Sequence, residues 1–153
     1  MPNWCQNTMV VLGTREQIEE FEKANKGKET VLTFEAAVPK PESEKDNWYN
    51  WNCEHWGTKW DACDAQVDHS DLGWECEEGE ESLTYSFDTA WSDPASWFEV
   101  LGAKWPDLKL ILNYVETGMD FSGQHISERK SRYTTTGSLP LSDLFACGFE
   151  ARF

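Results

Sequence analysis

The chain contains the stretch Ser82-Leu83-Thr84-Tyr85-Ser86-Phe87-Asp88-Thr89-Ala90-Trp91-Ser92-Asp93-Pro94. Residues 82–90 alternate between two faces. The apolar face contains Leu83, Tyr85 and Phe87, and the polar face contains Thr84, Ser86 and Asp88. This period of two predicts a strand with one buried face. A helix follows at once, because Ser92 or Asp93 can cap it, Pro94 fits its first turn and Pro106 ends it. Its buried side is predicted to contain Trp97, Val100 and Leu101.

The flanking sequence predicts further elements on both sides of this unit. Residues 8–12 form an apolar strand, and Thr14 with Gln17 forms the capping box of a helix that stops at 25–27. A second strand is expected at 30–36, before two prolines. After the helix, residues 108–114 form a strand whose hairpin partner is 119–127, with Phe121 inside and Gly123 at a bulge. The tail from 131 is predicted to hold one short helix near Ser142.

The order of these elements is a split βαβ pattern. It predicts an α+β, ferredoxin-like fold, with a mostly antiparallel sheet and two helices on one face. We expect a single domain over residues 1–153, with a long, irregular, Trp-rich acidic insertion at about 40–81 and a C-terminal extension at about 131–153.

Three motifs in this order resemble those of a known family. They are Pro2-Asn3-Trp4-Cys5-Gln6-Asn7, Gly57-Thr58-Lys59-Trp60-Asp61 and Asp88-Thr89-Ala90-Trp91-Ser92. Together they are similar to the YubB-like ferredoxin-fold proteins carried by bacterial plasmids and phages, although His55 and Asp93 depart from the pattern. The resemblance implies a ferredoxin-like fold without an iron–sulfur cluster and a mobile genetic element as the source. It implies no established reaction.

The composition restricts the partners and the compartment. The net charge is −15, and residues 60–81 contain nine acids and no Lys or Arg. Such a chain repels phosphate backbones and anionic membranes, so we expect protein partners with basic surfaces rather than nucleic acid or membrane. Five scattered cysteines without a paired motif indicate reduced thiols, and the start lacks a signal-peptide pattern. We therefore expect a protein of the bacterial cytoplasm.

Catalytic and metal-binding patterns are weak in this sequence, and we predict no enzyme and no cofactor. A zinc site remains open, since thiolates and imidazoles gather in one region as Cys53, His55, Cys63, His69 and Cys76. Their spacing matches no standard zinc motif. The acids at 61, 64, 68 and 71 lack the spacing of a calcium loop, and no nucleophile motif accompanies His125.

Tryptophan is the most informative residue type in the insertion and its flanks. Trp60 and Trp91 are expected to be largely buried and to anchor the insertion, with Thr58, Asp61, Asp88 and Thr89 bonding nearby backbone. The predicted partner-binding residues are the exposed aromatic turn and the acidic segment: Trp48, Tyr49, Trp51, Asp64, Asp68, Asp71, Glu75, Glu77 and Glu78.

Two functions remain open from the sequence. The first is a non-enzymatic acidic protein-binding module of a mobile element, in one version an inhibitor that occupies the basic groove of a host defence complex. The alternative is a small-molecule binder or enzyme with a pocket at the Trp60 and Trp91 loops. Its candidate residues are Trp56, Trp60, Asp61, Asp88, Trp91 and His125.

Overall fold

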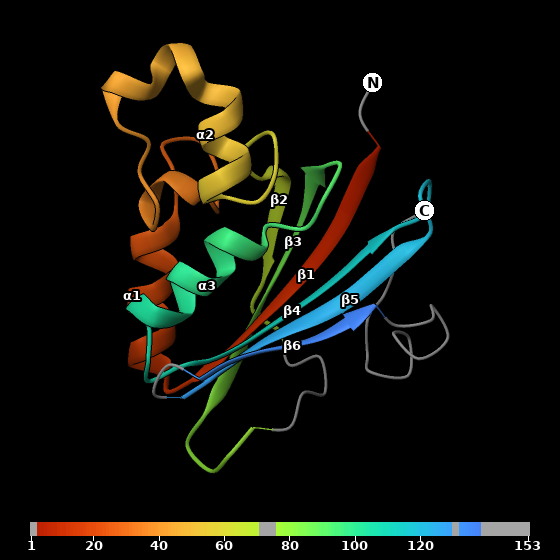
Figure 1. Ribbon diagram of the computed structural model, residues 1–153. Helices are drawn as coiled ribbons and strands as arrows, with labels where there is room; N and C mark the ends of the chain where they lie inside the picture. Colours follow the sequence, from red (N-terminus) through yellow and green to blue (C-terminus); the bar gives the residue numbers. More distant parts are fainter. Residues whose placement is uncertain (1–2, 71–75, 130–131, 139–153) are drawn as a thin grey trace.

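The computed structural model describes residues 3–70, 76–129 and 132–138 (Figure 1). Six strands form one sheet in the order β2-β3-β1-β4-β5-β6, and every neighbouring pair is antiparallel. The strands are β1 (Trp4–Gly13), β2 (Cys63–Asp68), β3 (Glu81–Ala90), β4 (Lys109–Glu116), β5 (Phe121–Glu128) and β6 (Arg132–Ser138). The helices are α1 (Arg15–Asn25), α2 (Trp48–His55) and α3 (Ala95–Lys104), with 3₁₀ helices at Phe34–Ala36 and Glu42–Asn47.

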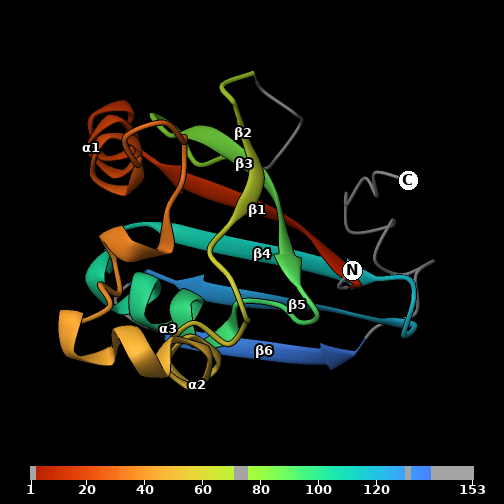
Figure 2. The same cartoon turned by 90° about the horizontal axis from the view of Figure 1, so that it is seen from above.

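The first four strands in this order make the ferredoxin-like core. β1 lies between β3 and β4, α1 follows β1, and α3 connects β3 to β4. The predicted α+β class and split βαβ plan are thus confirmed. Three helices rather than two lie on one side of the sheet, because α2 in the insertion joins α1 and α3 there (Figures 1 and 2).

The core lies between the sheet and these helices. Leu83, Tyr85 and Phe87 of β3 all point into it, as their alternation predicted. Aromatic rings dominate the packing, and the ring centroids of Phe34 and Trp97 are 4.4 Å apart. A smaller apolar cluster of Val10, Leu12 and Ile111 lies on the opposite face of the sheet. The two clusters follow from the period of two in strands whose faces are both apolar.

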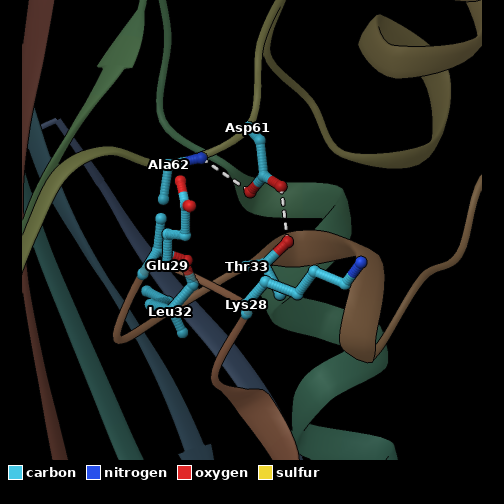
Figure 3. Close-up of a pocket in the computed structure, with 8 residues that line it drawn as sticks. Lys28, Glu29, Leu32, Thr33, Asp61 and Ala62 are labelled. Atoms are coloured by element: carbon cyan, nitrogen blue, oxygen red, sulfur yellow. Dashed lines mark hydrogen bonds between the residues drawn. The ribbon is translucent and has the colours of Figure 1, made fainter.

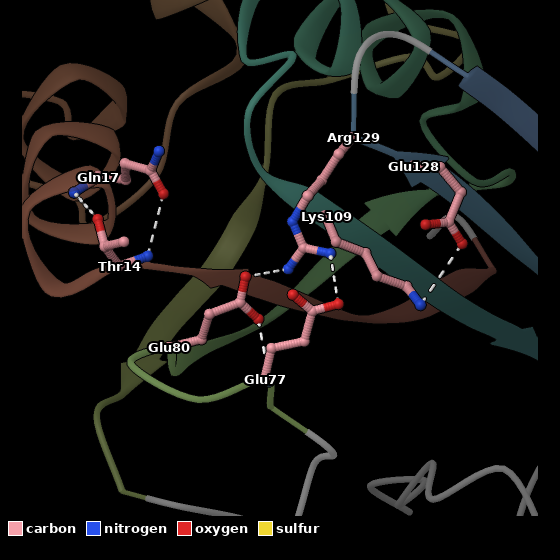
Figure 4. A network of polar contacts seen from close by, with 7 residues as sticks. All are labelled: Thr14, Gln17, Glu77, Glu80, Lys109, Glu128 and Arg129. Carbon is pink, nitrogen blue, oxygen red and sulfur yellow. Dashed lines mark hydrogen bonds and ion pairs between the residues drawn. The ribbon is translucent and has the colours of Figure 1, made fainter.

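The predicted N-terminal cap of α1 is confirmed, and the predicted cap of α3 is wrong. At α1 the capping box is present: Gln17 N donates to Thr14 Oγ1 at 3.3 Å and Thr14 N donates to Gln17 Oε1 at 3.0 Å (Figure 4). At α3 the N-cap residue is Pro94 itself, so neither Ser92 nor Asp93 caps the helix. The hydroxyl of Ser92 donates instead to the carbonyl of Gly57 at 2.6 Å.

The second strand lies elsewhere than the sequence predicts. Residues 30–36 form a loop and a 3₁₀ turn, because Leu32 and Phe34 are drawn into the core and Thr33 accepts a hydrogen bond from Glu35 N at 3.3 Å. The strand that pairs with β3 is Cys63–Asp68, inside the segment predicted to be irregular. The insertion therefore separates α1 from β2 and contains α2, which the sequence pattern also missed.

The C-terminal part of the sheet begins as predicted. β5 pairs with β4, Phe121 is half-buried against Tyr114, and the register of β5 with β6 shifts between Gly123 and His125. Arg129, just after β5, forms ion pairs with Glu77 and Glu80. These ion pairs join the segment before β3 to the end of β5 (Figure 4). The predicted helix near Ser142 lies outside the described residues.

Substitution of Gly102 tests the close packing of α3 on β5. A Cβ at Gly102 would lie 2.2 Å from Ser127 Oγ and 2.9 Å from its Cβ. We expect Gly102→Ala to lower the unfolding free energy by about 1–3 kcal/mol, although alanine favours a helix by about 1 kcal/mol over glycine. Urea unfolding measures the change. The double variant Gly102→Ala/Ser127→Gly removes the clash and is expected to recover much of the lost unfolding free energy. If the effects of the two single substitutions simply add in the double variant, this packing is contradicted.

Candidate functional site

The two tryptophan motifs meet in the structure. Thr58 Oγ1 donates to the carbonyl of Ala90 at 2.8 Å, and Trp97 N donates to the carbonyl of Trp56 at 3.3 Å. Gly57 has a φ of +86°, and a Cβ there would lie 3.1–3.3 Å from backbone atoms at the start of α3. Glycine at this position permits both the left-handed turn and the close approach. The segment before β2 is thereby fixed to the end of β3 and the start of α3.

Buried tryptophans attach the insertion to the core. Trp56 is 3% exposed and its Nε1 donates to the carbonyl of Val38 at 2.9 Å. Trp51 is 6% exposed, stacks on His55 with ring centroids 4.3 Å apart, and lies under Lys40. The prediction that Trp51 is an exposed anchor is wrong, because α2 turns this ring inward while Trp48 and Tyr49 remain exposed.

A set of side chains gathers where the two motifs meet, which we call the aromatic surface. It consists of the exposed rings of Trp4, Trp48, Tyr49 and Trp91 and the half-buried Lys59 and Trp60. Contacts link most of its members in a row. The rings of Trp4 and Trp60 are 6.1 Å apart, and Lys59 Nζ lies 4.7 Å from the Trp60 ring and 5.8 Å from the Tyr49 ring. Tyr49 in turn contacts Trp48 at 5.9 Å. The cation of Lys59 thus holds rings from two segments together.

Trp91 adopts an unusual backbone conformation within the aromatic surface. Its φ is +73°, a left-handed value that costs a residue other than glycine about 1–2 kcal/mol. Its N–H donates to the carbonyl of Asn3 at 2.9 Å, and Thr89 Oγ1 donates to the carbonyl of Ser92 at 2.6 Å, so the turn is held on both sides. The indole is 43% exposed. The expectation that Trp91 is largely buried is wrong, and Trp60 is half-buried.

Trp4 and Lys59 were not among the predicted site residues. A signal for Trp4 existed, since it shares a strand face with Gln6 and Thr8, where a polar residue would be expected. Met119, which is 63% exposed, follows Gly118, and a Cβ at Gly118 would lie 3.0 Å from the Asn3 side chain. Met119 is therefore a further large exposed hydrophobic side chain, in the turn between β4 and β5 that lies beside Asn3.

The predicted acidic residues separate into two kinds. Asp61 is structural: its carboxylate accepts from Thr33 Oγ1 at 2.6 Å, from Phe34 N at 2.7 Å and from Ala62 N at 2.7 Å. Burial raises the pKa of Asp61, and these hydrogen bonds partly oppose that effect. Asp64 and Asp68 are exposed on β2, and Glu77 and Glu78 are exposed before β3. Asp71 and Glu75 lie outside the described residues, and Asp88 is half-buried opposite Cys63.

His125 is enclosed rather than exposed to a pocket. Its side chain is 7% exposed, and its Nε2 lies 2.6 Å from Asp93 Oδ2. The ring stacks on Tyr114 at 5.1 Å and lies 6.0 Å from Phe98. These contacts join β5 to the turn that precedes α3. The arrangement gives His125 a packing and hydrogen-bonding role in the described structure.

The candidate zinc ligands are spread over several elements. Cys53 is exposed on α2, His55 Nδ1 lies 2.9 Å from the carbonyl of Trp51, and His69 Nε2 lies 2.5 Å from Glu22 Oε2. Cys63 is half-buried on β2 and Cys76 is exposed. Over residues 3–70, 76–129 and 132–138, no group of three or more His, Cys, Asp or Glu side chains is arranged to hold a metal ion.

A family model described as the ferredoxin-like domain in Api92-like protein matches residues 55–143. The chain belongs to this Api92-like family. The match agrees with the ferredoxin-like fold that the sequence motifs implied, and the name of the family describes a fold rather than a reaction.

A solved structure supports the fold independently. The crystal structure of protein Api92 from Yersinia pseudotuberculosis superposes with a TM-score of 0.53 at 15% sequence identity. The alignment covers 70% of this chain and 38% of that protein, so the chain spans less than half of its length. No curated protein sequence matches the chain. In the described part of the structure, no helix is long and apolar enough to cross a membrane.

Alanine substitution separates the structural acid from an exposed one. Asp61→Ala leaves the Thr33 hydroxyl and two backbone N–H groups without their acceptor, so we expect the unfolding free energy to fall by about 2–3 kcal/mol. Asp64→Ala, on exposed β2, is expected to change it by less than about 1 kcal/mol. Denaturant unfolding compares both variants with the unsubstituted chain. Equal effects would show that Asp61 does not hold the insertion.

Proposed function

We propose that this chain is a non-enzymatic protein-binding module. The aromatic surface carries the proposal, because it presents Trp4, Tyr49 and Trp91 at 37%, 50% and 43% exposure. Trp and Tyr are enriched in protein interfaces, where a rigid ring provides a large contact area at little entropic cost. The indole of Trp91 is held outward by a turn of unfavourable conformation, and strain of this kind commonly occurs at binding sites.

The charge supports a basic protein as the partner. At a net charge of −15, the chain attracts basic surfaces over a distance and repels nucleic acid and anionic membranes. Exposed Asp64 and Asp68 on β2 follow the aromatic surface directly in the chain. We infer an interface with an aromatic centre and an acidic margin, in which the rings supply affinity and the carboxylates speed association.

The biological setting of the proposal comes from the three sequence motifs. Their similarity to YubB-like proteins favours a plasmid or phage as the source and the cytoplasm of a bacterial host as the place of action. A host protein is then the natural partner. In one specific form of the proposal, the module inhibits a host defence complex by occupying a basic groove.

Trp91→Gly tests the proposal without unfolding the protein. Glycine adopts the positive φ freely, so relief of about 1 kcal/mol offsets the loss of ring contacts and stability should be nearly unchanged. Binding should fall at least about tenfold, since aromatic hot spots contribute about 2 kcal/mol or more. The measurement is affinity capture from a bacterial host lysate, with quantification of each retained protein.

Asp120→Gly is the matched control, because Asp120 also has a positive φ, +57°, but carries no ring. Proteins that the unsubstituted chain and the Asp120→Gly variant retain should be lost from the Trp91→Gly variant. If all three baits retain the same proteins in the same amounts, the aromatic surface is not the binding site.

A further inference from the structure

We propose that the outer edge of β2 binds an extended, lysine- or arginine-containing protein segment as an additional strand. The inference rests on the proposed function, because it names the kind of segment that a partner of this module presents. β2 begins three residues after Trp60 of the aromatic surface, so the two surfaces are adjacent in the chain.

Within residues 3–70, 76–129 and 132–138, no strand pairs with the outer edge of β2. β2 stands at the end of the sheet order, and its ladder partners are all in β3. Within an antiparallel strand, alternate residues direct their N–H and C=O groups toward the side away from the partner. Such a row of unpaired groups is a template for another strand. Strand addition is a common mode of peptide recognition, in which the backbone provides affinity and pockets provide specificity.

The side chains of β2 select the charge of the added strand. Asp64, Gln66 and Asp68 are exposed, whereas Ala65 and Val67 pack against the core on the helix side. Neither Asp64 nor Asp68 forms an ion pair with a Lys or Arg of the described residues. Cross-strand pairs of opposite charge contribute about 0.2–1 kcal/mol each, so lysine or arginine opposite these positions is favoured.

The same carboxylates disfavour a second copy of this chain as the occupant. Two copies paired through β2 would place four aspartates along one seam, and like charges directly opposite are destabilising. The bulge between Cys63 and Gln66, with Asp64 at a φ of +50°, also interrupts the edge. Charges of this kind protect edge strands from self-association. A basic strand meets opposite charges at the same positions and does not incur this repulsion.

A pocket adjoins the start of β2 and gives the added strand a second point of contact (Figure 3). Its volume is about 570 Å³, and its lining includes Lys28, Glu29, Leu32, Thr33, Asp61 and Ala62. The Asp61 carboxylate bonds Thr33 and Ala62 within the lining, so it does not require a cation. Half-buried Ala62 offers apolar contact. We therefore expect the segment to alternate basic residues with apolar ones of moderate size.

A fluorescein-labelled peptide of seven alternating lysines and valines is the probe, titrated against the full chain by fluorescence anisotropy. Two versions of this peptide, N-methylated on either the lysines or the valines, remove the backbone donors of one edge at a time. We expect the unmodified peptide to bind and one methylated version to bind at least about tenfold more weakly, because it loses its hydrogen bonds to β2. A glutamate–valine peptide should not bind.

Variants of the chain locate the contact. Asp64→Asn with Asp68→Asn keeps the shape of β2 and is expected to weaken binding about tenfold. Glu99→Gln with Asp107→Asn is the matched control: it removes the same charge from exposed positions on α3 and after it, outside β2, and should change the affinity less than about twofold. Hydrogen exchange should show new protection of β2 amides on binding.

Several outcomes would overturn the inference. They are equal binding of all three lysine peptides, equal effects of the two double variants, protection outside β2 only, or no binding at about 1 mM peptide. The Trp91→Gly variant should bind the peptide like the unsubstituted chain. If the peptide does not bind while capture from lysate still requires Trp91, this inference is wrong and the proposed function stands. If the peptide binds as expected but capture does not require Trp91, the β2 edge is a binding site and the aromatic surface is not.

Discussion

One buried hydrogen bond joins the insertion to the sheet. The hydroxyl of Thr58, 1% exposed, donates to the carbonyl of Ala90 at the end of β3. It forms beside Gly57, where only a glycine allows the chain to approach the first residues of α3. An unpaired hydroxyl at this depth would cost about 1–3 kcal/mol, so the two segments are fixed together. The contact places the segment that leads to Trp60 and β2 beside the end of β3.

The aromatic residues around that contact differ in burial. Trp56 and Trp97 lie beneath it and pack on Phe34 at 5.8 Å and 4.4 Å, so they fill the space between the insertion and the sheet. Trp60 and Trp91 emerge beside it and remain accessible. The described tryptophans near this loop are therefore of two kinds: buried rings hold a loop that has few aliphatic residues, and other rings remain accessible at its surface.

The sequence predicted the elements whose signals are local. α1 has its capping box and β3 its alternation, and both appear where expected. β2 was missed because Val67 is its only strong strand former, and its pairing with β3 comes from distant residues. Thr30–Thr33 has strand propensity, but burial of Leu32 and Phe34 and the acceptor Asp61 outweigh it. Nothing in the sequence around Trp91 indicates a left-handed tryptophan, because that conformation is imposed by Asn3 and Ser92.

The same contact accounts for the two kinds of acid in one stretch of sequence. Asp61 follows Trp60 and turns inward to accept three hydrogen bonds, which sets the direction in which the chain enters β2. Once that direction is set, the period of the strand places Asp64 and Asp68 outward along a sheet edge. Part of the net negative charge is therefore fixed along β2, in the strand that follows Trp60 in the chain. A flexible acidic loop would attract any basic surface, whereas in the proposed interaction carboxylates fixed along a strand select basic groups that have the spacing of a strand.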